Sequence, residues 1–205
     1  MALELKTPPA GEPLSLAEAQ VYLKTSDPAE DAWITSAIQA VREQCEAFTR
    51  RALMTQTWVL WRDAFPPPSF AGLNEIELPF PPLVSVTHLR TWDAGGTGTV
   101  FDSGNYLVDT ASTPGRVVLR ESGVWPSNLR NARSVEVEYA AGYGGAADVP
   151  EALRQGMLLW MRLLYADKTW LFDSGAPVPG LPGFNRDDLP LPVRALWDPY
   201  RLSRF

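Results

Sequence analysis

The chain has 205 residues, of which 45% are hydrophobic, a size at which a domain buries roughly 70% of the surface that its unfolded chain exposes. It can therefore build one or two domains with a sizeable core. Its net charge of −6 and its pI near 4.9 argue against a protein whose main task is to grip phosphate backbones, because that task needs a clustered positive field.

The first 13 residues, MALELKTPPAGEP, lack the charged start, apolar run and small-residue cleavage site of a secretory signal. We therefore expect synthesis and use in a cytosol, and we interpret residues 1–13 as a flexible or extended N-terminal arm. Ser15 and Glu18 then form a capping box that opens a short helix over residues 16–24. Such a short helix is not stable alone and should pack on the next one.

A long amphipathic helix is predicted over residues 28–53. Asp27 can cap its first free amides, Pro28 suits the first helical position, and Glu30 can complete the cap. The apolar positions recur at steps of four and three and form one stripe: Ile34, Ile38, Val41, Cys45, Phe48 and Ala52. The single cysteine, Cys45, is therefore interpreted as a small buried residue.

After residue 54 the apolar period changes from 3.6 to 2, and a β region is predicted over residues 56–140. Pro and Gly clusters separate its short extended segments, which favours antiparallel neighbours. In SVEVEY, apolar side chains alternate with Glu136 and Glu138, so one face of the sheet is expected to meet water.

Residues 150–166 are predicted to form a helix that is apolar almost all round. Its longest apolar run stops at Arg162, far short of the roughly 20 residues that a membrane helix needs. One side of this helix can face the stripe of the long helix and consists of Leu153, Met157, Trp160 and Leu164. The remaining apolar side chains must be covered by the sheet or by another subunit, and these are Leu159, Met161, Leu163 and Tyr165. Because a small chain rarely covers such a helix completely, we infer that the protein oligomerises.

Residues 170–205 are predicted to form a Pro-rich, extended C-terminal tail, because repeated prolines prevent a long helix there and leave at most a turn or two over residues 193–198. The tail is too rich in Trp, Leu and Phe for a solvated linker and should dock on another surface. Residues 186–205 contain four arginines and three aspartates, and Arg together with Trp is typical of interface anchors.

These elements predict an α+β fold that is mainly a helical bundle. The bundle would consist of the short helix, the long helix and the apolar C-terminal helix, and the antiparallel β region would be inserted between its helices. The core of the protein is then residues 14–169, preceded by the arm and followed by the tail.

No group of residues in the sequence indicates a catalytic centre, a metal or a cofactor. His88 lies in a predicted strand without a second histidine, and we interpret it as structural. The glycine clusters at 94–98 and 141–145 lack the features of a phosphate loop and are interpreted as turns and strand ends. Two pairs of carboxylates, at 187–188 and 30–31, could ligate a cation but do not define a site.

Eight tryptophans leave a second class of function open, that of a monomeric binding module. Trp58, Trp61, Trp92 and Trp125 could form a platform for glycan or peptide on the sheet. Core packing is the simpler interpretation of these side chains.

Several motifs in their order along the chain resemble one family. They are LSLAEAQVYL (14–23), EDAWITSAIQAVREQCEAFTRRAL (30–53), QTW (56–58), LPFPPLVSVTHL (78–89) and VEYAAGYGGAADVPEALRQGMLL (137–159). Over residues 14–166 this set resembles the head-tail connector, or adaptor, proteins of long-tailed phages and of phage-like gene transfer agents.

The resemblance implies a non-enzymatic structural virion protein that forms a ring of about twelve copies beneath the portal at the capsid vertex. Its partners would be the portal protein, the stopper or tail-side neck protein, and its own copies, with DNA only as transient cargo through the lumen and no membrane. The location would be the head-tail joint of a virion or phage-like particle, after assembly in the bacterial host cytoplasm. In such adaptors the C-terminal segment wedges against the portal, a role that residues 170–205 fit by position.

On physical grounds we nominate portal-facing anchors in the tail: Arg194, Trp197, Tyr200, Arg201 and Phe205. The candidates for contacts between neighbouring subunits are Glu43, Glu46, Arg50, Arg51, Leu159 and Leu163. The acidic net charge also suits the wall of a channel for DNA, because it repels phosphates.

Overall fold

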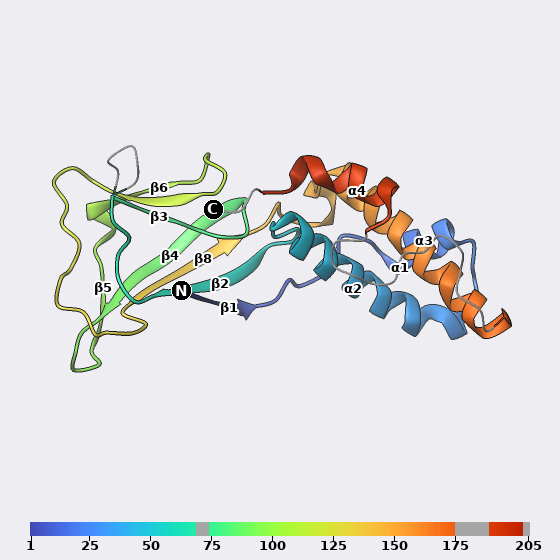
Figure 1. The fold of residues 1–205 in the computed structure, drawn as a ribbon, viewed down its shortest axis with the longest axis horizontal. Coiled ribbons are helices and arrows are strands. Elements are labelled where there is room, and N and C mark those ends of the chain that lie inside the picture. Colours follow the sequence, from blue (N-terminus) through green and yellow to red (C-terminus); the bar gives the residue numbers. More distant parts are fainter. Residues whose placement is uncertain (69–73, 175–188, 203–205) are drawn as a thin grey trace. The chain divides into compact units, whose positions relative to one another are not determined.

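The structure of the protein, a computed structural model, describes residues 1–68, 74–174 and 189–202. The chain divides into two compact units (Figure 1). The first, here called the sheet unit, contains Met1–Ala10 and Met54–Tyr143. The second, the helical unit, contains Gly11–Leu53 and Gly144–Phe205. Each unit is therefore assembled from segments that are distant in sequence.

The helical unit begins with α1 (Leu16–Leu23), whose N-terminus has the predicted capping box. The Ser15 hydroxyl accepts from the Glu18 amide at 3.2 Å, and the Glu18 carboxylate accepts from the Ser15 amide at 2.8 Å. The pKa of Glu18 is lowered, first by its hydrogen bond with the Ser15 hydroxyl. These bonds satisfy amides that a free helix end leaves without partners.

The long helix is shorter than the sequence predicted. A 3-10 turn, η1 (Pro28–Glu30), precedes α2 (Asp31–Thr49), and Asp27 caps the turn by accepting from the Ala29 amide at 2.9 Å. The helix ends at Thr49 because Arg50 adopts a left-handed conformation, φ 59°, and donates its amide to the Glu46 carbonyl. The predicted stripe is buried in its main part, at Ile34, Ile38, Val41, Cys45 and Ala52.

Two further helices belong to the described part of the helical unit. After η3 (Ala146–Asp148), α3 (Glu151–Ser174) extends beyond the predicted end at residue 166. Part of the predicted tail is also helical, in α4 (Leu191–Trp197) and η4 (Asp198–Tyr200). Among the residues that the structure describes, no helix has the length and apolar character to cross a membrane.

Eight antiparallel strands form the sheet unit within the described part of the chain. A five-stranded sheet has the order β1-β2-β8-β4-β5, and a three-stranded sheet has the order β3-β7-β6. The strands are β1 (Ala2–Thr7), β2 (Gln56–Arg62), β3 (Glu75–Glu77), β4 (Leu83–Trp92), β5 (Gly98–Val100), β6 (Tyr106–Asp109), β7 (Arg116–Leu119) and β8 (Val135–Ala141). A short 3-10 turn, η2 (Ser103–Asn105), leads into β6.

The prediction of a mainly helical bundle is therefore wrong. Helices contain 35% of the residues and strands 26%, and the strands build a separate compact unit with its own core. The expected N-terminal arm contains β1, which is extended and pairs with β2 at the edge of the larger sheet. That pairing joins residues fifty or more positions apart, so no local periodicity could reveal it.

The central strand β8 is buried on both faces, which the alternation of Val and Glu did not predict. On one face Val137 lies between Leu60 and Leu89 of the neighbouring strands, and all three are fully buried. On the other face Glu136 and Glu138 are also buried. The expectation that this face meets water is wrong, because neighbouring side chains pair with the carboxylates and cover them.

The smaller sheet carries a chain of charges across its strands. Asp109 on β6 accepts from Arg116 Nε on β7 at 2.9 Å, and Arg116 also donates to Glu75 on β3 at 2.8 Å. The Ser112 hydroxyl donates to Asp109 at 2.6 Å. This hydrogen bond has the largest effect on the pKa of Asp109, and the hydrogen bond from Arg116 has the second largest. Together they lower that pKa from 3.8 to about 2.

We expect this charge chain to be lost only in strong acid. Because the folded pKa of Asp109 lies below its ordinary value of 3.8, its stabilising effect is complete above about pH 4 and is lost as the pH falls through about 2. Carboxyl NMR should show the low pKa, and Asp109→Asn should abolish the corresponding acid transition of the β6 and β7 amides. Titration of Asp109 near 3.8 would contradict the arrangement.

Candidate assembly surfaces

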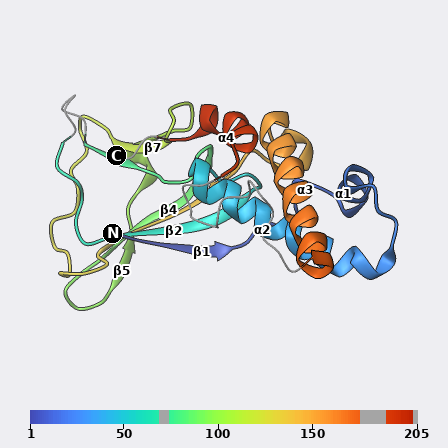
Figure 2. The same cartoon turned by 45° about the vertical axis from the view of Figure 1, so that its right-hand side comes forward.

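The C-terminal helix α4 packs on α3 (Figure 2). Trp197 is fully buried, and its indole nitrogen donates to the Leu153 carbonyl at 3.2 Å. Gly156 provides the space, since a Cβ there would lie 2.2 Å from the Trp197 indole nitrogen. The Phe48 ring of α2 lies 6.0 Å from the Trp197 ring. Trp197 therefore fills a socket formed by α2 and α3 of its own unit.

The residues after Trp197 also bind the helical unit. The Arg51 side chain donates to the Tyr200 carbonyl at 2.6 Å, and the Leu202 amide donates to the Thr49 carbonyl at 3.1 Å. The Arg201 guanidinium lies 4.8 Å from the centre of the Phe48 ring. The described end of the chain is thus an ordered part of this unit.

The predicted portal-facing residues differ in their burial and in the contacts that they make. Trp197 has an intramolecular role, as the anchor of α4. Arg194 and Arg201 remain at the surface, and Arg194 pairs with Asp198 at 3.2 Å. Tyr200 is half-buried, and Phe205 lies outside the described residues.

The predicted subunit-contact residues also differ in their burial. Glu46 is buried, where it accepts from Arg42 at 2.8 Å and from the Leu53 amide at 2.8 Å. Burial lowers the pKa of Arg42, but the hydrogen bond with Glu12 and the charge of Glu46 raise it above its usual value. Glu46 is therefore part of an internal network.

The other members of that set reach the surface to different degrees. Glu43 is exposed, whereas Arg50 is half-buried at the end of α2 and Arg51 binds the Tyr200 carbonyl. On α3, Leu159 and Leu163 are half-buried. Whether these side chains contact a neighbouring subunit stays a prediction.

The four tryptophans proposed as a binding platform do not lie together. Trp58 stacks on Phe80 with the ring centroids 4.8 Å apart, and Trp125 stacks on Phe65 at 4.3 Å. Only Trp61 and Trp92 are close, at 6.4 Å. The four-tryptophan surface expected for a glycan- or peptide-binding module is absent from the described sheet.

His88 has carboxylate neighbours that the sequence did not reveal. Its Nε2 lies 3.1 Å from Glu136, and its Nδ1 lies 4.0 Å from Glu138. The possible ligand atoms of the three side chains lie within 4.8 Å of one another. Strand register places His88 directly opposite Glu138, and sequence spacing alone cannot give that register.

This cluster fits a charge network better than a metal site. The two imidazole nitrogens of His88 face different carboxylates, whereas a single metal ion would bind only one of the two nitrogens. Glu138 already accepts from Lys6 at 2.5 Å, and Glu136 accepts from the Trp92 indole at 2.9 Å. Of the other candidates for cation binding, Asp187 and Asp188 lie outside the described residues, and Asp31 accepts from the Gln20 amide group at 2.6 Å.

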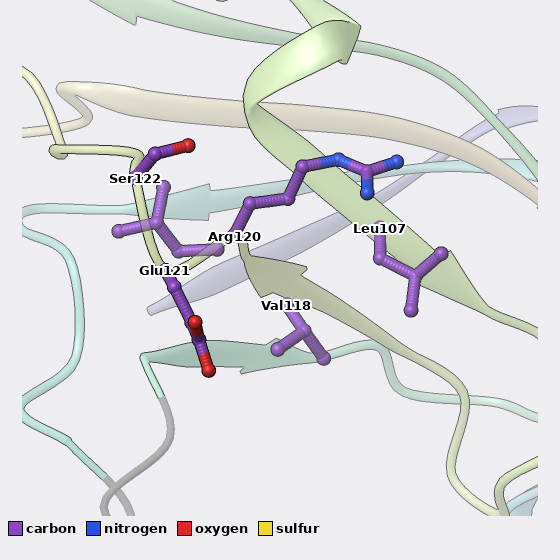
Figure 3. Close-up of a pocket in the computed structure, with 6 residues that line it drawn as sticks. Leu107, Val118, Arg120, Glu121 and Ser122 are labelled. Atoms are coloured by element: carbon purple, nitrogen blue, oxygen red, sulfur yellow. The ribbon is translucent and has the colours of Figure 1, made fainter.

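A shallow hollow of about 530 Å³ lies on the smaller sheet (Figure 3). Leu107 and Val118 lie opposite each other on β6 and β7, and Arg120 and Glu121 stand beside them. The hollow is open and its polar lining residues are exposed, so it lacks the buried polar groups of a specific small-molecule site.

The molecule is thus an α+β protein composed of an antiparallel sheet unit and a helical unit with a folded C-terminal segment. Its fold is shared with chains in three solved structures of gene transfer agent particles. They are the neck of an empty particle computed with C6 symmetry (TM-score 0.73), the virion of a native particle (0.74) and the neck of a native particle computed with C12 symmetry (0.68). In each case the identity is 24%, and the match covers 100% of this chain and 97% of the other.

No family model matches the sequence, and no curated protein does. The structural likeness shows the fold, which is that of a component of gene transfer agent particles. It agrees with the resemblance to head-tail connector proteins that the motifs indicated.

Proposed function

We propose that this protein is a structural component of the neck of a phage or phage-like particle, and specifically the adaptor between the portal and the tail-side neck proteins. The observation that carries this proposal is the fold. The full chain shares it with chains in solved structures of gene transfer agent particles, two of which are structures of the neck. The motif resemblance supports the same function independently. A structural role requires no catalytic centre, and we infer none.

A ring of twelve copies is the arrangement that we propose. One of the similar structures is a neck computed with C12 symmetry. A ring of identical copies is closed by a heterologous contact, in which one surface of a subunit meets a different surface of the next. The half-buried apolar side chains of α3, including Leu159 and Leu163, are candidates for such a contact.

The lumen of this ring would conduct DNA without binding it. The net charge of −6 supports that role, because acidic walls repel phosphates. A lumen lined mainly by Lys and Arg in an assembled particle would contradict it.

The C-terminal segment is the part that we propose faces the portal. Trp197 fixes α4 on the helical unit, which leaves the surface residues Arg194 and Arg201 to bind a partner. A pre-ordered segment loses less conformational entropy on binding than a free tail. Tyr200 and Phe205 complete the proposed portal-facing set, and the stopper or tail protein would bind elsewhere on the ring.

The test is co-sedimentation with the portal, combined with electron microscopy of particle necks. Arg194→Glu/Arg201→Glu should abolish portal attachment and leave the circular dichroism spectrum unchanged. The matched control, Lys24→Glu/Arg162→Glu, carries the same charge change at exposed positions of the same unit and should attach normally. Wild-type attachment by the first variant would refute the tail assignment, and necks without density for this chain would refute the proposed function.

A further inference from the structure

Two tryptophans and three arginines form a continuous surface on the five-stranded sheet, here called the Arg–Trp platform (Trp61, Trp92, Arg90, Arg130 and Arg133). Trp61 and Arg90 lie on either side of Glu136 in the register of β2, β8 and β4, so they share one face. Trp92, two residues after Arg90, lies on the same face, and its ring is 6.4 Å from that of Trp61.

The three guanidinium groups lie over the two indole rings. Arg133 is 4.8 Å from the centre of the Trp61 ring, and Arg130 is 4.9 Å from that of Trp92. Arg90 lies over Trp92 at 5.9 Å. These distances are those of cation–π contacts, which hold the guanidinium against the ring.

Hydrogen bonds that involve the backbone hold Arg130 and Arg133 in the loop that precedes β8. The Arg130 amide donates to the Trp92 carbonyl at 3.0 Å, and the Arg130 side chain donates to the Arg133 carbonyl at 2.6 and 3.1 Å. The Arg133 amide donates to Asp63 at 2.9 Å, and its φ of 51° is unusual for a residue with a side chain. The platform is therefore pre-organised, at a cost in backbone strain.

The positive charge of the platform is only partly neutralised. Arg90 pairs with the buried Glu136 at 3.5 Å. Arg133, whose side chain is 58% exposed, reaches only Glu4, at 4.0 Å, and Glu4 is itself 61% exposed. Arg130 forms no ion pair with a carboxylate among the described residues. Arg133 thus presents a guanidinium group that matches carboxylates in shape and charge, and Arg130, whose Nε and Nη2 donate to the Arg133 carbonyl, adds positive charge beside it.

We propose that the Arg–Trp platform binds the acidic start of α2 on a neighbouring copy of this chain. The segment between Lys24 and Arg42 has no basic residue, and its carboxylates are Asp27, Glu30 and Asp31. Platform and segment are different surfaces with opposite charge, as a heterologous ring contact requires. Arg and Trp are also the residues most enriched among those that dominate interface energies. This inference rests on the proposed ring and names one of its contacts.

Charge reversal in assembled particles tests the contact. Arg130→Glu/Arg133→Asp places carboxylates on the platform, and Asp is chosen at 133 because it tolerates left-handed backbone. The control Arg120→Glu/Arg162→Glu has the same charge change at exposed positions outside both the platform and the acidic segment. We expect at least about a tenfold drop in the fraction of necks with a complete ring for the platform variant only, because apposed like charges oppose association.

A second pair of substitutions separates the possible outcomes. Asp27→Lys/Asp31→Lys, added to the platform variant, should restore ring occupancy by exchanging the charges. Normal rings in the folded platform variant would overturn the inference and leave the proposed function standing. Absence of this chain from wild-type necks would overturn both. Loss of DNA binding with intact rings would assign the platform to phosphate contacts and also refute the inference.

A disulfide experiment decides the matter if charge reversal prevents folding. Arg133→Cys with Ala29→Cys places one thiol on the platform and one beside Asp27, while the natural Cys45 is buried. Oxidation of assembled particles should give a ladder of covalently linked subunits that each single-cysteine variant lacks. A double variant that assembles but gives only monomer would refute the contact.

Discussion

Replacing Trp197 with alanine should lower the free energy of unfolding by about 3–5 kcal/mol, the usual cost of removing a fully buried large aromatic side chain. The substitution removes the ring from the socket at Gly156 and the hydrogen bond to the Leu153 carbonyl. The predicted consequence is release of α4 from α3. Urea unfolding measures the loss of stability, and limited proteolysis measures the release.

Two controls isolate the role of the indole ring. Leu191→Ala on the same helix removes a side chain that is 81% exposed and should change the stability by less than about 0.5 kcal/mol. Trp197→Phe keeps much of the packing and loses the hydrogen bond, for a smaller loss of roughly 1–2 kcal/mol. If Trp197→Ala unfolds at the same urea concentration as Leu191→Ala, the socket does not hold α4.

The result also bears on the proposed portal contact. If the C-terminal segment binds the portal as an ordered element, Trp197→Ala should weaken portal attachment although Trp197 is buried and touches no partner. The portal-facing substitutions at Arg194 and Arg201 should weaken attachment without a comparable loss of stability. Urea unfolding and portal co-sedimentation of the same variants therefore distinguish the anchor of α4 from its exposed surface.

Replacing Gly142 with alanine should destabilise the sheet unit by about 3 kcal/mol or more. Its φ is +134°, a region that residues with side chains rarely adopt, and a Cβ would lie 2.2 Å from the Met54 carbonyl oxygen. Gly142 directly follows β8, and Met54 shortly precedes β2, two strands that pair along their whole length. Because the added carbon meets backbone, no side chain can move aside to make room.

Gly145 in the same glycine cluster is the matched control for Gly142. Its φ is −83°, and the nearest atom to an added Cβ is 3.7 Å away, in Asp148. Gly145→Ala should therefore leave stability within about 0.5 kcal/mol of wild type. Equal thermal unfolding curves for the two alanine variants would show that the close approach at Met54 does not restrict residue 142.

Gly142 and Gly156 show what the motifs did and did not reveal. The cluster AGYGG was interpreted as a strand end, and Gly142 does follow β8, but the reason for a glycine is its contact with the distant Met54 backbone. Likewise Gly156 lies within the helix that was predicted to be apolar almost all round. Its partner Trp197 lies forty-one residues later, beyond the predicted end of the bundle.

Features that depend on near neighbours in the chain could be predicted from the sequence. The cap at Ser15 and Glu18, the apolar stripe around Ile34 and the burial of Cys45 follow from hydrogen bonds and side-chain spacing within a few turns of helix. The order of motifs also indicated the class of protein whose fold the chain shares.

Contacts between distant segments became known only from the folded chain. It paired β1 with β2, placed His88 opposite Glu138, packed Trp197 into the Gly156 socket and brought the arginines of one loop over Trp61 and Trp92. The physical reason is that a strand specifies its side-chain alternation locally, but its partner and register depend on which faces can be buried together across the whole chain. The anchor of the C-terminal segment and the Arg–Trp platform are both products of that long-range choice.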